Sequence, residues 1–505
     1  MHDGAPATIT LSLISHTNVG KTTLARTLLG RDVGEVRDAP HVTDLAEGHR
    51  LLASDAGDEL RLWDTPGFGD SVRLARRMRQ ADQPLGWFLT QVWDRFTDRP
   101  FWGTQQALRN VREQADVVLY LVNASEAPQA AAYVRPEMDL LEWVGKPVVV
   151  LLNQLGAPQD AAHEADEVER WRLHLADRAL VRQVLPLDAF ARCWVQEGVL
   201  LAAVEAALPA SKREAMARLR AAWQARHQAV FDDSMRVLAA SLARIATARV
   251  TVGEGGGVAA ELRTQLRELG SKLRGAGGPA GPVAVAQQAL AEALDREVRD
   301  STGRLIALHG LDGQAEGEIL ERLATHYDMR LRIDEGKAAV LGGVVTGALA
   351  GLKADLATGG LTLGGGMIAG GLLGALGAAG VARLVNVVRG TETSWIGWDA
   401  AVLDGLVEAA LLRYLAVAHF GRGRGEWAQS EAPPHWPEAV REALAPHREA
   451  LAALWASRPA GPAADAEAAQ RLAAELQPHL AAAATDLLRR LYPAAVQHAP
   501  HTLVA

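Results

Sequence analysis

The fold of this chain is decided by Ser15-His16-Thr17-Asn18-Val19-Gly20-Lys21-Thr22, the stretch at residues 15–22. An apolar strand precedes the stretch, and a helix follows it from Leu24 to Gly30. The apolar residues of that strand are Ile9, Leu11, Leu13 and Ile14. The stretch follows the pattern G-x-x-x-x-G-K-[ST], with Ser15 in place of the first glycine. A strand, this loop and a helix in this order predict a phosphate-binding P-loop.

Each part of this loop has a predicted role in holding a nucleotide. Backbone N–H groups of residues 18–23 would bind phosphate oxygens at the N-terminus of the helix. Gly20 lets the backbone approach the phosphates because it has no Cβ. Lys21 would bridge the β- and γ-phosphates, and the Thr22 hydroxyl would bind Mg²⁺. The nucleotide-binding residues predicted here are Ser15, His16, Thr17, Asn18, Val19, Gly20, Lys21, Thr22 and Thr23.

The composition limits the number of domains and the class of partner. The chain has 505 residues, 49% of them hydrophobic, which is too long for one core and predicts two or three domains. A net charge of −8 argues against nucleic acid as a partner. Cys193 is the only cysteine, so no disulfide can form within the chain. The N-terminus lacks the features of a signal peptide, and we therefore expect a cytoplasmic protein.

Residues 8 to about 208 alternate between strand and helix patterns, which predicts an α/β domain with a mostly parallel sheet. Arg50 to Ser54 and Glu59 to Trp63 are typical of a hairpin that turns at Gly57-Asp58. Two unbroken apolar runs indicate central strands covered on both faces, Val117 to Val122 and Val148 to Leu152. A short last strand is predicted at Leu185-Pro186-Leu187.

Asp64, Gly67 and Thr43 complete the predicted site. Asp64 ends a strand beside the P-loop strand, where its carboxylate can hold the Mg²⁺ shell through water. The Gly67 N–H can meet the γ-phosphate. Thr43 is the only threonine between the P-loop helix and Asp64, in a polar segment that can close over the nucleotide. The predicted catalytic residues are Lys21, Thr43 and Gly67, and the predicted metal ligands are Thr22, Thr43 and Asp64.

Several of these residues carry a resemblance to a known family. They are Asn18-Val19-Gly20-Lys21-Thr22-Thr23-Leu24, Leu28-Leu29-Gly30, Thr43 and Trp63-Asp64-Thr65-Pro66-Gly67. With them, the chain resembles the Era/TrmE-like GTPases over roughly residues 8–208. The resemblance implies GTP/GDP and Mg²⁺ as ligands, with switch segments around Thr43 and Asp64 to Gly69. A narrower resemblance is to bacterial GTPases that carry an uncharacterised, Gly-rich helical C-terminal domain. The residues that fit this group are Thr17-Asn18-Val19-Gly20, Asp38-Ala39-Pro40-His41-Val42-Thr43 and Asp188-Ala189-Phe190-Ala191.

Two positions depart from that family and leave alternatives open. The guanine-reading motif of the family is Asn-Lys-x-Asp, whereas this chain has Asn153-Gln154-Leu155-Gly156. Asn153 and Gln154 are predicted to contact the base. Gly156 offers no carboxylate to guanine, so an NTPase that uses ATP or discriminates poorly stays open. Phe68 stands where some GTPases carry a water-orienting glutamine, so a nucleotide-binding scaffold or membrane tether with little hydrolysis stays open too.

Residues 69–115 form a long connection before the next strand, which we interpret as a helical insertion. The insertion contains an aromatic patch at 87–102, in a chain with only 5% aromatic residues. The patch consists of Trp87, Phe88, Trp93, Phe96, Phe101 and Trp102. Either these side chains pack on the C-terminal region, or they form a surface for a protein partner or a membrane.

Strand patterns disappear after about residue 208, and helical spacing of Leu, Ala, Arg and Glu predicts a mostly α-helical domain at 209–505. A long helix is predicted at 211–248. Residues 338–382 are Gly-rich and contain only two charged residues, Lys353 and Asp355. Glycines spaced by four residues let two helices approach closely, and basic residues flank the segment on both sides. We expect a hairpin inserted into the membrane from the cytoplasmic side, with a tightly packed soluble hairpin as the alternative.

Together, the residues and the resemblance predict a P-loop GTPase domain at 1–208 followed by the helical domain at 209–505. The domain is expected to hydrolyse GTP to GDP and phosphate with Mg²⁺, slowly without a partner. Its nucleotide state is expected to be coupled to a helical, membrane-associated region at the cytoplasmic membrane.

Overall fold

The computed structural model describes twelve segments of the chain. They are residues 6–17, 19–29, 47–80, 83–90, 99–153, 161–187, 193–252, 282–311, 385–389, 394–419, 435–459 and 466–493. The predicted site residues Asn18, Thr43 and Gln154 lie outside them, and so does the Gly-rich segment 338–382. The chain divides into two compact units. The first unit comprises residues 1–231, 418–435 and 487–505, and the second comprises 232–417 and 436–486. The domain boundary at 208/209 stays a prediction.

The first unit is built on a six-stranded sheet with the strand order β2-β3-β1-β4-β5-β6. The strands are β1 (Thr8–Ser15), β2 (Glu47–Ala53), β3 (Glu59–Asp64), β4 (Val117–Asn123), β5 (Val148–Asn153) and β6 (Val181–Pro186). Only β2 runs antiparallel, in a hairpin with β3, and the other neighbouring strands are parallel. The predicted hairpin turn is present, with Gly57 at a φ of +85°. The predicted mostly parallel α/β domain is therefore confirmed for these strands.

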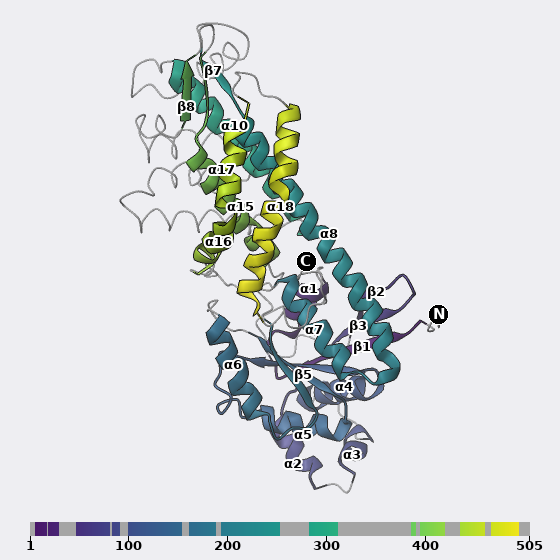
Figure 1. The fold of residues 1–505 in the computed structure, drawn as a ribbon. Coiled ribbons are helices and arrows are strands. Elements are labelled where there is room, and N and C mark those ends of the chain that lie inside the picture. The colour runs from purple at the N-terminus through teal and green to yellow at the C-terminus, as the bar shows by residue number, and fades with distance from the viewer. Residues whose placement is uncertain are drawn as a thin grey trace, which may run out of the picture. The chain divides into compact units, whose positions relative to one another are not determined.

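Helices cover both faces of this sheet, because its central strands are apolar along their whole length. The helices are α1 (Lys21–Leu29), α2 (Ser71–Met78), α3 (Pro84–Thr90), α4 (Arg99–Glu113), α5 (Val134–Val144), α6 (Ala161–His174) and α7 (Trp194–Ala207). Ile14, Tyr120 and Val150 belong to a core cluster that also contains residues of α2 to α6. Figure 1 shows α5 and α7 on opposite sides of the sheet. The carboxyl ends of β1 and β3 lie side by side, because Leu13 pairs with Asp64.

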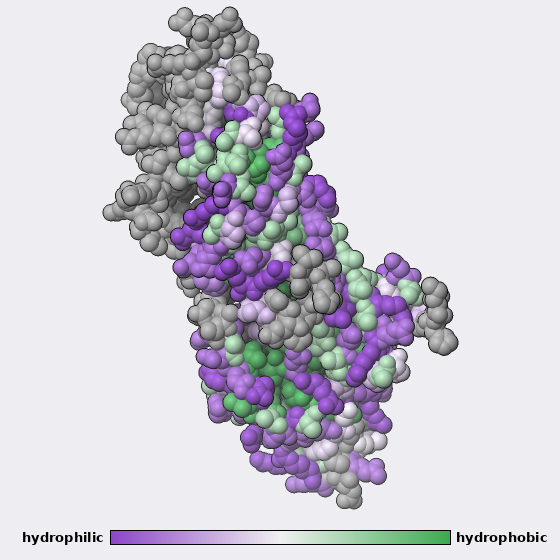
Figure 2. Space-filling model, viewed as in Figure 1, coloured by the Kyte–Doolittle hydropathy of each residue, from purple (hydrophilic) through white to green (hydrophobic). Residues whose placement is uncertain are grey.

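The insertion at 69–115 contains the helices α2, α3 and α4, whose buried aromatic residues pack on the sheet domain rather than on the C-terminal region, while the predicted partner surface stays a prediction. These helices contact α5, and α4 also contacts β1, so they belong to the core of the first unit. Phe88 and Phe101 are fully buried there, and Trp87 is partly buried against the same core. On the face in view, Figure 2 shows mainly hydrophilic and neutral residues over α2 and α3. The described aromatic residues of the patch thus contribute mainly to the core, while Trp93 and Phe96 lie outside the described residues.

The second unit is largely helical, as predicted, but it also contains strands that the sequence analysis missed. Its described helices are residues 232–247 of α8 (Ala210–Thr247), α10 (Pro282–Leu308), α15 (Ala400–Ala418), α16 (Trp436–Leu444), α17 (Arg448–Ala456) and α18 (Ala466–Leu491). Strands β7 (Val250–Val252), β8 (Val385–Arg389) and β9 (Ser394–Trp398) form an antiparallel sheet in the order β7-β9-β8. Val, Ile and Trp favour pairing here, but strands this short give little sequence signal.

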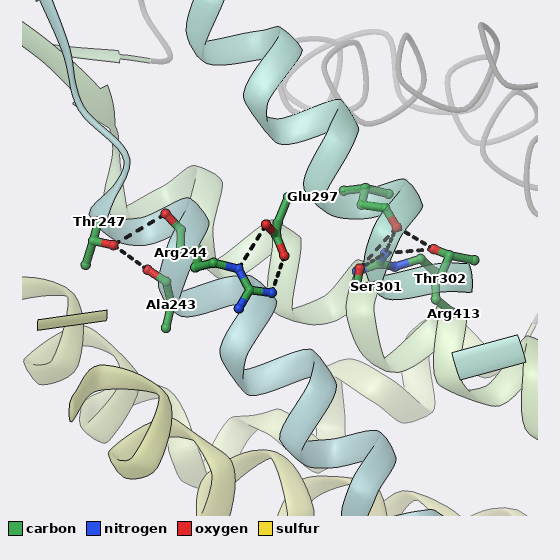
Figure 3. A network of polar contacts seen from close by, with 8 residues as sticks. Ala243, Arg244, Thr247, Glu297, Ser301, Thr302 and Arg413 are labelled. Atoms are coloured by element: carbon green, nitrogen blue, oxygen red, sulfur yellow. Dashed lines mark hydrogen bonds and ion pairs between the residues drawn. The ribbon is translucent and has the colours of Figure 1, made fainter. Parts of the chain in front are cut away.

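Polar contacts fix how the helices of the second unit pack (Figure 3). Arg413 on α15 is buried, and its Nη1 donates at 3.1 Å to the Val298 carbonyl and to the Ser301 and Thr302 hydroxyls of α10. Arg244 on α8 donates from Nε to Glu297 of α10 at 3.0 Å. A buried guanidinium is costly without such hydrogen bonds, so the Arg413 contacts favour one arrangement of α10 and α15, while the more exposed Arg244–Glu297 pair links α8 to α10. Among the described helices, none is both long and apolar enough to span a bilayer.

Candidate nucleotide-binding site

The P-loop turns between the end of β1 at Ser15 and the start of α1 at Lys21. Gly20 has a φ of +91°, a conformation that residues with a Cβ rarely adopt. A Cβ at this position would also lie 2.8 Å from the Asn153 side-chain nitrogen. The Leu24 N–H donates to the Gly20 carbonyl at 2.9 Å, which begins the hydrogen bonding of α1. Glycine is therefore required at this position on two independent grounds.

Lys21 is buried at the start of α1, with only 8% of its surface exposed. Its Nζ donates to the Ser15 hydroxyl at 3.0 Å, so the serine that replaces the first glycine of the motif holds the lysine. Burial lowers the pKa of Lys21, whereas the charges of Asp64 and Glu137 oppose that shift. A Cβ on Gly67 would come within 3.1 Å of Nζ, so the Gly67 backbone lies directly beside the ammonium group.

Thr22 and Asp64 meet at the carboxyl end of the sheet. The Thr22 hydroxyl donates to Asp64 Oδ2 at 2.6 Å, while Asp64 Oδ1 is buried without a hydrogen-bond partner among the described residues. Burial raises the pKa of Asp64, and the Thr22 hydrogen bond and the Lys21 charge oppose the shift. The Thr22 hydroxyl and the Asp64 carboxylate are oxygen ligands of the kind that Mg²⁺ prefers, and one oxygen of this carboxylate accepts no hydrogen bond from the described residues. These residues therefore fit Mg²⁺, which Thr22 and Asp64 would hold.

The segment after β3 is attached to β1 and to the P-loop. The Thr65 hydroxyl donates to the Leu13 carbonyl, and the Phe68 N–H donates to the Ser15 carbonyl at 2.9 Å. Phe68 and His16 form an isolated parallel bridge. Gly67 is held between these attachments, and a Cβ on it would lie 3.2 Å from Thr17 Cα. The backbone at Gly67 is thus fixed next to the P-loop, where the sequence analysis places the γ-phosphate.

Asn153 lies at the end of β5 and is fully buried. Its side-chain nitrogen donates to the Val19 carbonyl at 2.7 Å, so Asn153 supports the P-loop from the neighbouring strand end. The predicted contact of Asn153 with a base stays a prediction, and Gln154 and Gly156 lie outside the described residues. Thr23 is buried on α1, next to Thr22.

A buried carboxylate that no sequence motif predicted lies beside the loop. Glu137 lies in the first turn of α5 and is fully buried. Its Oε1 lies 2.7 Å from His16 Nδ1, and its Oε2 accepts from the Tyr120 hydroxyl at 2.6 Å. The His16 ring stacks on Tyr133 at a centroid distance of 4.5 Å. The sequence contains one indication that Glu137 is buried, namely its position among the apolar residues Val134, Met138 and Leu141 of the same helix.

These features define a class of protein. A P-loop at the carboxyl end of a mostly parallel sheet, with a buried lysine and a Thr–Asp pair, is the site of a P-loop nucleotide-binding domain. Residues 10–154 match the family described as "50S ribosome-binding GTPase", and residues 329–482 match "Domain of unknown function (DUF3482)". The chain therefore contains a GTPase domain of the first family at residues 10–154 and a C-terminal DUF3482 domain at residues 329–482.

Solved structures similar to this chain include two of Era. The chain is 18% identical to Era of Aquifex aeolicus bound to GDP and aluminium fluoride, covering 40% of this chain and 57% of that one at a TM-score of 0.30. It is 17% identical to Era in complex with MgGDPNP and a 16S ribosomal RNA segment, covering 40% and 58% at 0.31. A probable GTP-binding protein, engB, is 17% identical, with 35% and 88% covered at 0.19. The chain thus spans somewhat more than half the length of the Era structures. No curated protein gave a significant match.

Proposed function

We propose that the GTPase domain binds GTP with Mg²⁺ and hydrolyses it to GDP and phosphate. The observation that carries this proposal is the Thr22–Asp64 hydrogen bond of 2.6 Å, formed beside the buried ammonium group of Lys21. The hydroxyl, the carboxylate and the lysine converge at the N-terminus of α1, where backbone N–H groups favour phosphate. These are the groups that phosphoryl transfer from a nucleoside triphosphate needs.

Each residue of the site has a defined role in binding the triphosphate or its metal. Lys21 binds the β- and γ-phosphate oxygens with its ammonium group, and the Gly67 N–H donates to the γ-phosphate. Thr22 and Asp64 hold Mg²⁺, with Thr43 as a third predicted ligand from the segment outside the described residues. When bound, Mg²⁺ neutralises phosphate charge that develops during transfer. The P-loop residues accordingly position the triphosphate, and Thr22 and Asp64 orient its metal.

We propose that hydrolysis is slow without a partner. Phe68 follows Gly67 and is fully buried in the core cluster, so its side chain cannot orient an attacking water. This observation also favours the second candidate function, a nucleotide-binding scaffold with little hydrolysis. The rate of single-turnover hydrolysis separates these two functions.

We further propose that nucleotide state is coupled to membrane contact through residues 338–382. The support for this contact is the sequence of the segment, which lies outside the described residues. Its length without charge and its glycine spacing are those of a hairpin that enters a bilayer from one side.

The deciding experiment is single-turnover hydrolysis of GTP with and without Mg²⁺, by the wild type and by Asp64→Asn. We expect the wild type to form GDP and phosphate only with Mg²⁺, and Asp64→Asn to be slower by about tenfold or more. Asp177→Asn, at an exposed carboxylate, is the matched control and should leave the rate unchanged. Tight GTP binding without turnover would instead support the scaffold. Equal affinities for ATP and GTP in parallel titrations would support a poorly discriminating NTPase.

A further inference from the structure

Glu137 is fully buried beside the P-loop with a hydrogen-bond partner at each carboxyl oxygen, and the proposed hydrolysis does not use it directly. A fully buried carboxylate is costly unless hydrogen bonds and opposite charge compensate it. Here His16 and Tyr120 occupy both carboxylate oxygens, at 2.7 Å and 2.6 Å. Burial raises the pKa of Glu137, and the His16 hydrogen bond opposes that shift. Its place in the first turn of α5 also favours the negative charge.

The partner of Glu137 lies in the part of the loop that holds the Gly67 backbone. His16 forms the bridge to Phe68, and the preceding carbonyl, of Ser15, accepts the Phe68 N–H. A displacement of His16 would therefore move the place where Gly67 is docked. The N–H groups at the start of α1, which would bind the β-phosphate, lie further along the chain than this bridge.

We infer that Glu137 and His16 are positioning residues for the γ-phosphate side of the site. Glu137 holds His16 in place, and His16 in turn holds the backbone of Gly67 and Phe68 against the P-loop. The pair thereby contributes to distinguishing GTP from GDP, since only GTP has a phosphate at Gly67. This inference rests on the proposed binding of GTP. No sequence motif predicts this pair, because His16 and Glu137 are 121 residues apart.

The test compares affinities for GTP and GDP, because general damage to the loop would lower both alike. His16→Leu removes the contact with Glu137 and leaves a buried carboxylate oxygen without that partner, so the unfolding midpoint is measured beside the two affinities. We expect the affinity for GTP to fall by about tenfold relative to that for GDP, with a matching loss of single-turnover rate. His16→Asn, which can again donate to Glu137, should recover most of the GTP affinity.

Two further variants separate positioning from stability. Glu137→Leu with Tyr120→Phe replaces the buried polar contacts by apolar groups of similar volume, which often preserves stability. We expect this double variant to show the same loss of GTP over GDP as His16→Leu. Ser12→Ala is the matched control, because it breaks another buried hydrogen bond of β1, to Asn110 at 2.6 Å, away from the loop. It should lower the unfolding midpoint without changing the ratio of the two affinities.

The outcomes distinguish this inference from the proposed function. If the wild type binds neither GTP nor GDP, the proposed function is wrong. If the wild type binds both, and His16→Leu keeps their affinity ratio within about twofold, the positioning role is wrong while GTP binding stands. The result for His16→Leu decides the case even if the double variant fails to fold.

Discussion

Lys21 lies with its Nζ 3.0 Å from the Ser15 hydroxyl and beside the backbone of Gly67. We expect Lys21→Ala to weaken GTP binding by about a hundredfold or more, because it removes the compact charge that meets the β- and γ-phosphates. Titration calorimetry measures the affinity directly. Lys146→Ala, which removes a lysine from the turn before β5, should bind GTP as the wild type does. Unchanged affinity in Lys21→Ala would remove the P-loop assignment.

Recognition of the base also depends on single residues. Asn153 supports the P-loop through Val19, and position 156 is a glycine with no carboxylate for the guanine N–H groups. We therefore predict a preference for GTP over ATP that is weaker than in a GTPase with the full Asn-Lys-x-Asp motif. Gly156→Asp should increase this preference by about tenfold or more, as measured by competition of ATP against a labelled GTP analogue. Competition by ATP as strong as that by GTP in the wild type would contradict the prediction.

The elements of the first unit were largely predictable from the sequence. The apolar runs at β4 and β5 and the Gly57 turn each carry a local signal, and all three are present. The aromatic residues of α3 and α4 were less predictable. A dense group of apolar side chains predicts burial, but it does not say which part of the protein they pack against. The sheet of β7, β8 and β9 was missed because its strands are short and pair across long sequence distances.

The candidate site also contains both predictable and unpredictable residues. Ser15 to Thr22 and Asp64 belong to short motifs whose residue spacing predicts nucleotide binding. In the structure, Lys21 contacts Ser15 and Thr22 contacts Asp64. Glu137 belongs to no motif and lies near the loop only because α5 packs over β4. A contact of that kind depends on the folded arrangement of helices, which no local pattern encodes.

Ion pairs attach the first part of α8 to the strand ends opposite the nucleotide site. Arg218 donates to both oxygens of Asp58, at 2.8 and 2.9 Å, and Asp58 is fully buried at the β2–β3 turn. Lys212 contacts Asp116 at 2.7 Å, just before β4. The hydrogen bond from Arg218 holds the pKa of Asp58 well below its ordinary value of 3.8, against the effect of burial.

We expect Asp58→Asn to lower the free energy of unfolding of the first unit by about 2 kcal/mol at pH 7. Because the pKa of Asp58 is depressed in the folded state, its contribution is fully present above the unfolded value of about 3.9 and is lost as pH falls below it. The difference between variant and wild type should therefore begin to shrink near about pH 4 and continue to shrink toward about pH 2, as followed by urea unfolding. Glu214→Gln removes the exposed second partner of Arg218 and should change stability by less than about 0.5 kcal/mol. A difference independent of pH would show that Asp58 acts through packing rather than charge.

At the scale of the whole molecule, the chain combines a GTPase domain with a DUF3482 domain at residues 329–482. The Gly-rich segment 338–382 lies inside that second match. Its two uncharged runs are separated only by Lys353-Ala354-Asp355. In an inserted hairpin these charges would lie near the turn, where pairing or contact with headgroups reduces the cost of burial. Basic residues on both flanks would stay at the cytoplasmic surface.

We therefore expect the intact protein to float with liposomes of anionic and neutral lipids, and a variant lacking 338–382 to remain in the supernatant. Leu372→Arg should reduce flotation, because an arginine near the bilayer centre costs about 3 kcal/mol or more. Leu173→Arg is the matched control: it makes the same change at a leucine of α6 that is 61% exposed, and should leave flotation unaltered. Gly370→Arg would not distinguish an inserted hairpin from a soluble one, because it blocks the close approach of the two helices in both. If the intact protein stays in the supernatant without detergent, the segment packs as a soluble hairpin, and nucleotide state must act on something other than a membrane.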